Sequence, residues 1–522
     1  MQDELEKEIA HQAEKLVRRA EVQRWAERKD RERYEKRTGE TGLEKAPYTP
    51  ISWGLHDHFD PKYCMRHRKF LARVLWSKIL DGAYKPQPAL VSEIKKATGG
   101  TRKVMTFTTP DTAIASLFHR RMTKRNVNRL SASSYAFRFD RNIFDAILSI
   151  CEAIDRGGVF VVRYDFRSYF DNIDHRYLLD VLLNRCLFTI SRAEEGIIRA
   201  FLKHSFAARE DYQAGKFEQR DIGVPQGNSL SLFLSNVAAH DLDIALETRN
   251  GRFARFADDL LAITHTLDEA REISAAVQMY CLRSGARTNP AKPHGIYRLA
   301  FEPGPFDPPL PETMDHVPKI DKVNFLGHSL HSIGVTLPNK TVSMIKRRMS
   351  KCIYIHLLHN PRSRKLFNRA RVGAGFFDWD FVTCLNELRR MIYGDITEGE
   401  ILTFLDGKAK LRRPEKMMRN LPMITDPAPL IALDGWLVSV LHRALKERER
   451  VLAKNFAIET YTAPSERSII TGDWFVFPEM QGEIEPRCPS FVRGWRAARK
   501  YYYAFGTRGL SPPAYSYSGR DD

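Results

Sequence analysis

Two short apolar runs flank a pair of acidic residues near the middle of the chain. Residues 253–256 and 260–264 have the apolar and β-branched content of strands, and an Ala-Asp-Asp triplet at 257–259 lies between them. The pattern predicts a β-hairpin that carries Asp258 and Asp259 at its turn. Because two buried carboxylates repel each other and lose hydration, a purely structural role for this pair would be costly.

Other segments have equally clear patterns. Residues 157–166, GGVFVVRYDF, are a continuous β-branched and aromatic run, which predicts a buried strand with Asp165 near its end. Residues 175–187 have helical periodicity, with Asn172 or Asp174 available to cap the first turn. The proline-rich stretch at 303–312 is incompatible with a strand or a helix and predicts a surface loop.

The two ends are predicted to be helical. Residues 3–37 are densely charged, and apolar side chains recur on one helical face at Leu5, Ile9, Ala13, Leu16 and Ala20. This helix lies on the body of the protein or on a partner, or is simply solvated.

With 522 residues the chain is too long for one ordinary core. We predict four parts, at 1–48, 49–339, 340–450 and 451–522.

The net charge says more about possible binding partners than the overall composition does. The hydrophobic content of 43% is that of a globular protein, but 82 Lys and Arg against 64 Asp and Glu give a net charge of +18. This balance favours a polyanionic partner, most simply a nucleic acid, although a basic surface for solubility is the alternative.

Cysteine usage and segment polarity bear on location. The seven cysteines include no C-x-x-C pair, which argues against a zinc ribbon or a disulfide framework and fits a reducing cytosol. No run approaches the roughly 18 apolar residues of a membrane span, and the acidic N-terminus does not resemble a signal peptide. We expect a soluble cytoplasmic protein without a membrane partner.

The three acids suggest a chemistry. Asp165, Asp258 and Asp259 at neighbouring strand ends would form a hard-oxygen site suited to Mg²⁺. Two such ions, for which Mn²⁺ is a substitute, serve phosphoryl transfer in polymerases. A bound cation would also keep the acids ionised, which removes the objection to burying them.

A series of motifs, in order, resembles a prokaryotic reverse transcriptase. They are KKATGGTRKVMTF at 95–107, SSYAFRFDRNIFDAI at 133–147, RYDFRSYFDNIDH at 163–175, GVPQGNSLSLFLSN at 223–236, RFADDLLAI at 255–263, SGARTNPAKPHGI at 284–296 and NFLGHSL at 324–330. The resemblance implies an α+β right-hand polymerase, with fingers and palm over 49–339, a helical thumb, an N-terminal helix and a helical C-terminal extension.

The resemblance also assigns roles to residues. Asp165, Asp258 and Asp259, with the backbone of Phe166, are implied to hold metal, and Lys292 to protonate the departing pyrophosphate. Phe170, five residues after Asp165, is implied to block a ribose 2′-hydroxyl and so to select deoxynucleotides.

Nucleotide binding is assigned in the same way. Basic residues on a Gly-Gly hairpin can neutralise triphosphate charge, and glycines around Pro225 and Gln226 let the backbone approach a nucleotide. The implied nucleotide-binding residues are Lys95, Lys96, Arg102, Phe166, Phe170, Gln226 and Gly227.

Departures from better-known relatives narrow the subclass. There is no V-T-G triplet of the retron kind and no H-N-H segment of the intron kind, although retron or group II intron-like enzymes remain alternative subclasses. The chain looks most like the unknown-group and abortive-infection reverse transcriptases. This implies antiphage defence, a non-coding RNA partner, dNTP substrates and a DNA product, with self-association left open. Template-independent or protein-primed DNA synthesis, or a non-catalytic nucleic-acid scaffold, are alternative functions.

Basic and aromatic residues follow the last motif. Lys346, Arg347, Arg348 and Lys351 form a phosphate-tracking groove or a solvated face. In residues 491–509, aromatic and basic side chains alternate, as in a docked C-terminal helix or a single-strand binding surface. Candidate priming hydroxyls are Tyr501, Tyr502, Tyr503, Tyr515 and Tyr517. His56 and His58 lack a third ligand nearby, so ordinary hydrogen bonding is favoured over metal binding.

Overall fold

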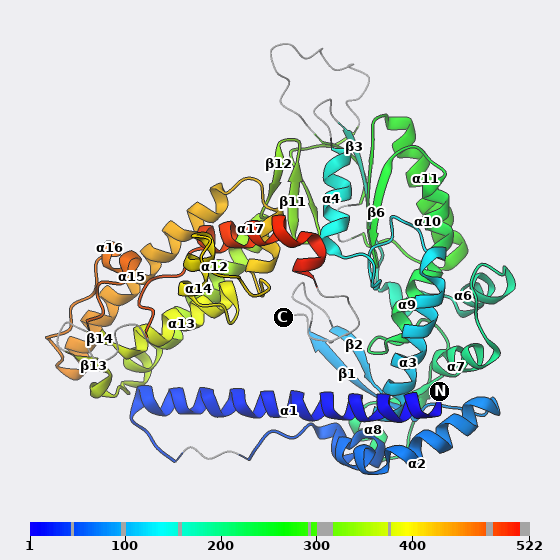
Figure 1. Ribbon diagram of the computed structural model, residues 1–522, viewed down its shortest axis with the longest axis horizontal. Coiled ribbons are helices and arrows are strands. Elements are labelled where there is room, and N and C mark those ends of the chain that lie inside the picture. Colours follow the sequence, from blue (N-terminus) through cyan, green and yellow to red (C-terminus); the bar gives the residue numbers. More distant parts are fainter. Residues whose placement is uncertain are drawn as a thin grey trace. The chain divides into compact units, whose positions relative to one another are not determined.

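The structure is a computed structural model (Figure 1), which describes residues 1–42, 46–95, 101–154, 159–290, 294–299, 317–373, 377–476 and 484–511. The described residues form two compact units. The first contains Met1–Trp25 and Pro47–Asp321, and the second contains Ala26–Ala46 and the described residues from Lys322 to Ser511. These units follow packing, not the predicted boundaries of fingers, palm and thumb, so the four-part division stays a prediction.

The first unit is built on a five-stranded sheet with the strand order β6-β7-β3-β8-β9. The predicted hairpin is confirmed as β6 (Arg252–Phe256) and β7 (Asp259–Thr264), and the predicted buried strand as β3 (Val159–Asp165). One detail differs, since Asp259 is the first residue of β7 and the turn consists of residues 257 and 258 alone. Strands β8 (Gly295–Leu299) and β9 (Lys319–Ile320) complete the sheet.

Both faces of this sheet are covered. Successive residues of a strand point to opposite faces, and every residue of β7 after Asp259 is buried. Helix α4 (Ile143–Ala153) packs on β6 and β7, and helix α11 (Leu267–Ser284) packs on β3, β7 and β8. Figure 1 shows both helices running alongside the strands. The acids at the strand ends therefore project from a rigid, two-sided support.

A second sheet of the first unit has the order β2-β1-β4-β5. Strands β1 (Ala89–Lys95) and β2 (Thr101–Thr106) form an antiparallel pair, as predicted for the basic fingers hairpin. The remaining elements of this unit are β4 (Ser205–Ala207), β5 (Glu218–Gln219), α2 (Pro61–Leu80), α3 (Thr109–Asn126), α5 (Tyr169–Asn172), α6 (His175–Leu179), α7 (Arg192–Leu202), α8 (Arg209–Gln213), α9 (Leu230–Ala238) and α10 (His240–Glu247).

The N-terminal helix α1 (Gln2–Thr38) confirms the predicted long helix. Leu5, Ile9, Ala13 and Ala20 are buried and Leu16 is half-buried, so the apolar face lies on the protein body, not in solvent. Leu5 and Ile9 join the main core of the first unit. Hydrophobic burial, not the many charges, thus fixes this end of α1.

The helix predicted over 175–187 is only partly right. Asp174 caps α6 by accepting from the backbone N–H of Tyr177 at 2.8 Å, as expected. After Leu179 the chain widens into a π-helical turn over Asp180–Asn184, and Cys186 has a positive φ of 54°. Periodicity alone did not reveal this widening. The predicted loop at 303–312 lies outside the described residues.

The second unit is mainly helical, as predicted after residue 340. A small antiparallel sheet contains β10 (Val323–Phe325), β11 (His328–His331) and β12 (Gly334–Thr336). The other elements are β13 (Val372–Gly373), β14 (Phe377–Asp378), α12 (Asn339–Leu357), α13 (Trp379–Tyr393), α14 (Glu398–Leu405), α15 (Ala428–Phe456), α16 (Glu466–Thr471) and α17 (Phe491–Leu510).

Helix α15 is the one described helix that is long and apolar enough to meet a membrane-span criterion. Core helices of globular proteins meet the same criterion. Leu433, Leu437, Leu441 and Leu445 are fully buried along one side of α15, which packs against α12 and α17. This packing accounts for the leucines along that side of the helix.

Candidate active site

The register of two strands brings the predicted acids together. Antiparallel pairing of β3 with β7 places Asp165 directly opposite Asp259. The backbone N–H of Phe166 donates to the carbonyl oxygen of Asp258 at 3.1 Å, so β3 also touches the turn. Asp165 is only 4% exposed, while Asp258 and Asp259 are half-buried. The three acids therefore lie at adjoining strand ends, as the sequence predicts.

The turn that carries Asp258 is strained. A two-residue hairpin turn requires positive φ, which glycine or asparagine normally supplies. Here Ala257 occupies the left-handed region at φ 58°. Its carbonyl oxygen accepts from Nη1 of Arg255 at 3.1 Å. A non-glycine residue persists in this conformation where surrounding contacts hold it, and Arg255 is such a contact.

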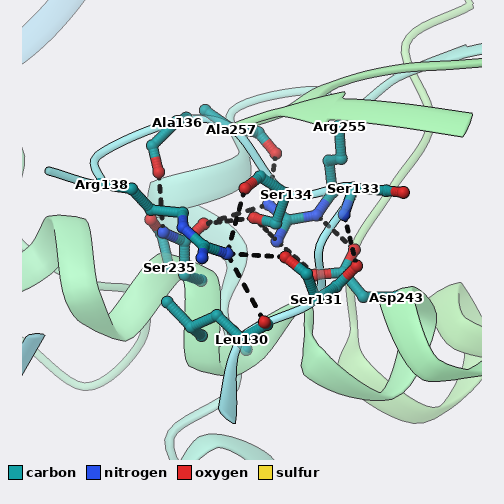
Figure 2. Close-up of polar contacts among 12 residues, drawn as sticks. Leu130, Ser131, Ser133, Ser134, Ala136, Arg138, Ser235, Asp243, Arg255 and Ala257 are labelled. Carbon is teal, nitrogen blue, oxygen red and sulfur yellow. Dashed lines mark hydrogen bonds and ion pairs between the residues drawn. The ribbon is translucent and has the colours of Figure 1, made fainter. Parts of the chain in front are cut away.

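Arg255 is the centre of a buried polar network (Figure 2). It is 0% exposed and forms a two-point ion pair with Asp243 of α10, which is 1% exposed, with both N–O distances at 2.6 Å. Burial alone would lower the pKa of Arg255, but the charge and hydrogen bonds of Asp243 outweigh burial and raise it. The guanidinium is therefore a permanent cation beneath the turn.

The same network fastens the segment that precedes α4. Nη2 of Arg255 donates to Oγ of Ser134 at 2.8 Å, and backbone hydrogen bonds join Arg255 to Ser133 and Tyr135. Arg138 is also buried and donates to the carbonyl oxygens of Ser131 and Ser134 (Figure 2). Residues 133–138, SSYAFR, thus pair with strand β6 and hold it in place.

Asp165 has a second anchor from the segment after α11. Nδ2 of Asn289 donates to the Asp165 carboxylate at 3.1 Å, and the Asn289 N–H donates to the Asp165 carbonyl at 2.8 Å. Sequence reasoning missed Asn289, Arg255 and Asp243. Two signals were available in the sequence. Asn289 lies in the motif at 284–296, and Arg255 is a charged residue within the mainly apolar run at 253–256.

The sugar-selecting candidate Phe170 is half-buried against aromatic neighbours. Its ring makes edge contacts with Phe137 and Tyr169, at centroid distances of 6.2 and 6.1 Å. Its carbonyl oxygen accepts from the Val224 N–H at 2.7 Å, and a side chain at Gly223 would lie 2.6 Å from that oxygen. Packing therefore holds the ring next to the loop at 223–227.

The loop at 223–227 is also fastened to the fingers. The Met105 N–H of β2 donates to the Gln226 carbonyl at 2.7 Å. Gly227 has φ 114°, and a Cβ there would lie 2.0 Å from the Met105 carbonyl, so glycine is required. The side chain of Gln226 donates to Asp171 at 3.0 Å.

The basic candidates differ in how far the structure places them. Lys95 and Arg102 are exposed on the β1–β2 hairpin, whereas Lys96 and Lys292 lie outside the described residues. In the second unit, Lys346 lies 5.5 Å from the ring centroid of Trp436, and Arg347, Arg348 and Lys351 are exposed.

The donor set fits Mg²⁺. Among the described residues, no three His, Cys, Asp or Glu side chains form a ready-made metal cage. Mg²⁺ commonly binds through one or two carboxylates and completes its shell with substrate phosphates and water. Asp165 and Asp259, opposite each other on β3 and β7, and Asp258 on the adjoining turn have hard oxygen ligands of this kind.

The remaining candidates are the two histidines near residue 57 and the C-terminal tyrosines. Nδ1 of His56 accepts from the His58 N–H at 3.0 Å and caps a short helical turn, in line with the favoured structural role. Tyr501 is buried and Tyr502 half-buried, whereas Tyr503 is 69% exposed. Tyr515 and Tyr517 lie outside the described residues. Tyr503 is therefore the most exposed of the three described tyrosines, and its hydroxyl accepts from Nε of Arg499 at 2.8 Å.

Comparison with known proteins gives one family and several distant relatives. Residues 94–330 match the family of reverse transcriptases (RNA-dependent DNA polymerases), in agreement with the predicted α+β polymerase fold. Protein YkfC of Escherichia coli (strain K12) is 29% identical over 181 residues, which cover 34% of this chain and 45% of YkfC. The chain thus spans less than half the length of that relative.

Two solved telomerase structures are also similar. Apo telomerase from Candida tropicalis, truncated from the C-terminal domain, has a TM-score of 0.35 and 15% identity, covering 52% of this chain and 59% of that chain. Telomerase from Candida albicans in complex with a TWJ fragment of telomeric RNA has a TM-score of 0.36 and 10% identity, covering 76% and 67%.

Proposed function

We propose that the chain is an RNA-directed DNA polymerase, a nucleotidyltransferase that adds deoxynucleotides to a primer, on the premise that residues 94–330 match the family of reverse transcriptases. The observation that carries the proposal is the cross-strand pair of Asp165 and Asp259, with Asp258 on the adjoining turn. A purely binding scaffold would have no use for three acids held this closely in a basic protein.

The chain's own residues have distinct tasks in this scheme. Asp165, Asp258 and Asp259, with the Phe166 carbonyl, would hold two Mg²⁺ ions, for which Mn²⁺ can substitute. When bound, these ions favour ionisation of the primer 3′-hydroxyl and stabilise charge on the leaving pyrophosphate. Lys292 donates a proton to that pyrophosphate.

The incoming nucleotide meets a second set of residues. The cations of the fingers hairpin, Lys95, Lys96 and Arg102, neutralise triphosphate charge. Gln226 and Gly227 line the nucleotide, which replaces Asp171 as the partner of the Gln226 side chain. The ring of Phe170, held by Phe137, occupies the space of a 2′-hydroxyl and excludes ribonucleotides.

The proposal also includes a biological setting for the enzyme. We infer a non-coding RNA partner, a DNA product and a role in bacterial antiphage defence, in the cytoplasm and with no membrane partner. Support comes from the resemblance to defence-associated reverse transcriptases and from the helical region after residue 340. Protein-primed or template-independent synthesis uses the same acids and is the second candidate, favoured by the exposed Tyr503.

Primer extension tests the enzymatic proposal. Purified protein with Mg²⁺, dNTPs and a primed RNA template should extend the primer, and Asp258→Ala should reduce the rate at least about 10³-fold, or about 4 kcal/mol. The control is Asp268→Ala, which removes an exposed acid of α11 and should leave the rate unchanged. Extension without template, or DNA covalently attached to protein, would favour the second candidate. Wild type that is inactive in all formats would overturn both.

Sugar selection has its own test. Phe170→Ala should open space for the 2′-hydroxyl and reduce the preference for dNTPs over rNTPs by about 10- to 100-fold in kcat/KM. The matched control is Phe188→Ala, since Phe188 is a buried aromatic of the same unit that packs on Phe233 instead. An unchanged preference in the folded Phe170 variant would remove this residue from the proposed mechanism.

A further inference from the structure

The outward face of α2 carries an unusual concentration of positive charge. Lys62, Arg66, Lys69 and Arg73 follow the 4-3-4 spacing that places residues on one side of a helix, and all four are exposed. Helix α2 contains no Asp or Glu. These four cations, defined here as the α2 basic face, extend over twelve residues, or about 16 Å along the helix axis.

The α2 basic face is not neutralised by the protein. Within the described chain, none of its four side chains forms an ion pair. The neighbouring Arg68 points elsewhere and pairs with Glu6 of α1 at 3.2 Å. Other exposed cations have acidic partners, such as Arg121 with Glu4 and Arg199 with Glu195. The α2 cations therefore remain available to an outside anion.

The acids nearest this face do not cancel it. Glu14 and Glu21 of α1 line a groove of about 710 Å³ with Lys62 and Arg66, but beyond ion-pair distance. Asp60 caps the start of α2, and Asp81 accepts from Ser77 at its end. None of these acids forms an ion pair with Lys69 or Arg73, so this part of the face stays positive.

An aromatic ring lies among the cations. Phe70 is 54% exposed, and the Arg73 guanidinium lies 5.8 Å from its centroid. Single-stranded nucleic acids bind to surfaces where basic groups track phosphates and exposed rings stack on bases. A membrane-surface helix would instead present a continuous apolar face, and here Phe70 and Leu80 are the only exposed large hydrophobic residues of α2.

We propose that the α2 basic face is a docking site for single-stranded RNA outside the polymerase site. The proposal rests on the proposed function for its choice of RNA as the polyanion. Helix α2 precedes the segment 94–330 that matches the reverse transcriptase family, so this site is additional to that domain. It would hold a part of the RNA that is not being copied.

RNA binding at several salt concentrations tests the docking site. The full chain in an Asp258→Ala background is titrated with a labelled unstructured RNA, so that catalysis plays no part. The variant K62Q/R66Q/K69Q/R73Q should bind about 10- to 100-fold more weakly near 0.15 M salt. The slope of log Kd against log salt should become shallower by about 3, since each phosphate contact contributes roughly 0.7.

A matched variant controls for net charge. R121Q/R199Q/R271Q/K446Q removes the same four charges from positions that already have acidic partners, and it should change affinity less than about 3-fold. The swap K62R/R66K/K69R/R73K keeps every charge and should bind RNA as the parent does. Equal losses in the glutamine variant and the matched control would overturn the proposal.

Two further outcomes are decisive. If the glutamine variant keeps its RNA affinity but loses binding to phosphatidylserine vesicles that the parent binds, the face is a membrane surface and the RNA site is wrong. If the protein never extends a primer yet loses RNA affinity through this variant, the proposed function fails and the docking site stands.

Discussion

Among the residues that the structure describes, each unit contains one arginine with no exposed surface, and these two arginines have different roles. Arg255 of the first unit pairs with Asp243, and Arg448 of the second pairs with Asp378 and Asp380 at 2.8 and 2.9 Å. Each guanidinium also donates to a backbone carbonyl, that of Ala257 in one case and that of Leu357 in the other. The two arginines make the same types of interaction, but the carbonyls belong to different structural elements.

The difference lies in what each arginine holds. Leu357 is the last residue of α12, and Arg448 also lies 5.0 Å from the ring centroid of Phe367, so its network joins helices. Ala257 belongs to the strained turn before Asp258, so the Arg255 network positions an acid of the candidate site. A buried ion pair therefore does not indicate function by itself. The groups that the arginine contacts determine whether the pair supports a functional site or only the packing of helices.

The largest expected effect comes from removing either arginine. Arg255→Met and Arg448→Met each leave a carboxylate buried and unpaired, which should cost about 3–5 kcal/mol of stability. Hydrogen exchange should lose protection at 252–264 in the first variant and at 339–393 in the second. If both variants lose protection in the same unit, the two networks are not independent and the comparison fails.

A milder change separates positioning from stability. Asp243→Asn keeps the side-chain volume but weakens the hold on Arg255, so the folded variant should lose about 10- to 100-fold in kcat because the acids shift. The Mg²⁺ concentration for half-maximal rate should rise, which a smaller folded fraction would not cause. Asp378→Asn is the control and should leave this concentration unchanged. A similar rise in both variants would remove the special role of Arg255.

The contrast also explains how much of the site was predictable. The hairpin and the acids on it were predicted because the apolar pattern of its two strands is a local property of residues 253–264, although the turn was predicted one residue too long. The partners of Arg255 come from distant segments, with Ser134 before α4 and Asp243 on α10. The periodicity of the sequence does not encode such pairings, so the sequence predicted Arg255 only as a residue of a strand.

Asn289 illustrates the same limit. Its contact with Asp165 depends on the segment after α11 running beside the end of β3, a pairing that spans more than a hundred residues of chain. Conversely, the N-terminal helix was predictable because its own apolar spacing determines which face is buried. Sequence patterns thus gave the elements and the acids, whereas the groups that hold the acids required the fold.

The smallest expected effect uses two alanines in the left-handed region, one in each unit. Ala257 has φ 58° in the hairpin turn, and Ala457 has φ 52° after the last turn of α15. Glycine adopts this conformation freely, so each Ala→Gly variant should change the free energy of unfolding by no more than about 1 kcal/mol, because relief of strain offsets the entropy gained by the unfolded chain.

Activity should nevertheless divide the two alanine variants. Ala257→Gly loosens the turn that presents Asp258, so primer extension should slow by about 2- to 10-fold at saturating Mg²⁺, within the range expected for small misplacements. Ala457→Gly should extend primers at the parent rate. Matched unfolding curves with unequal rates would show that the strain at Ala257 positions the acid. Equal rates in both variants would mean that the turn is held by Arg255 alone, and the strain would be incidental.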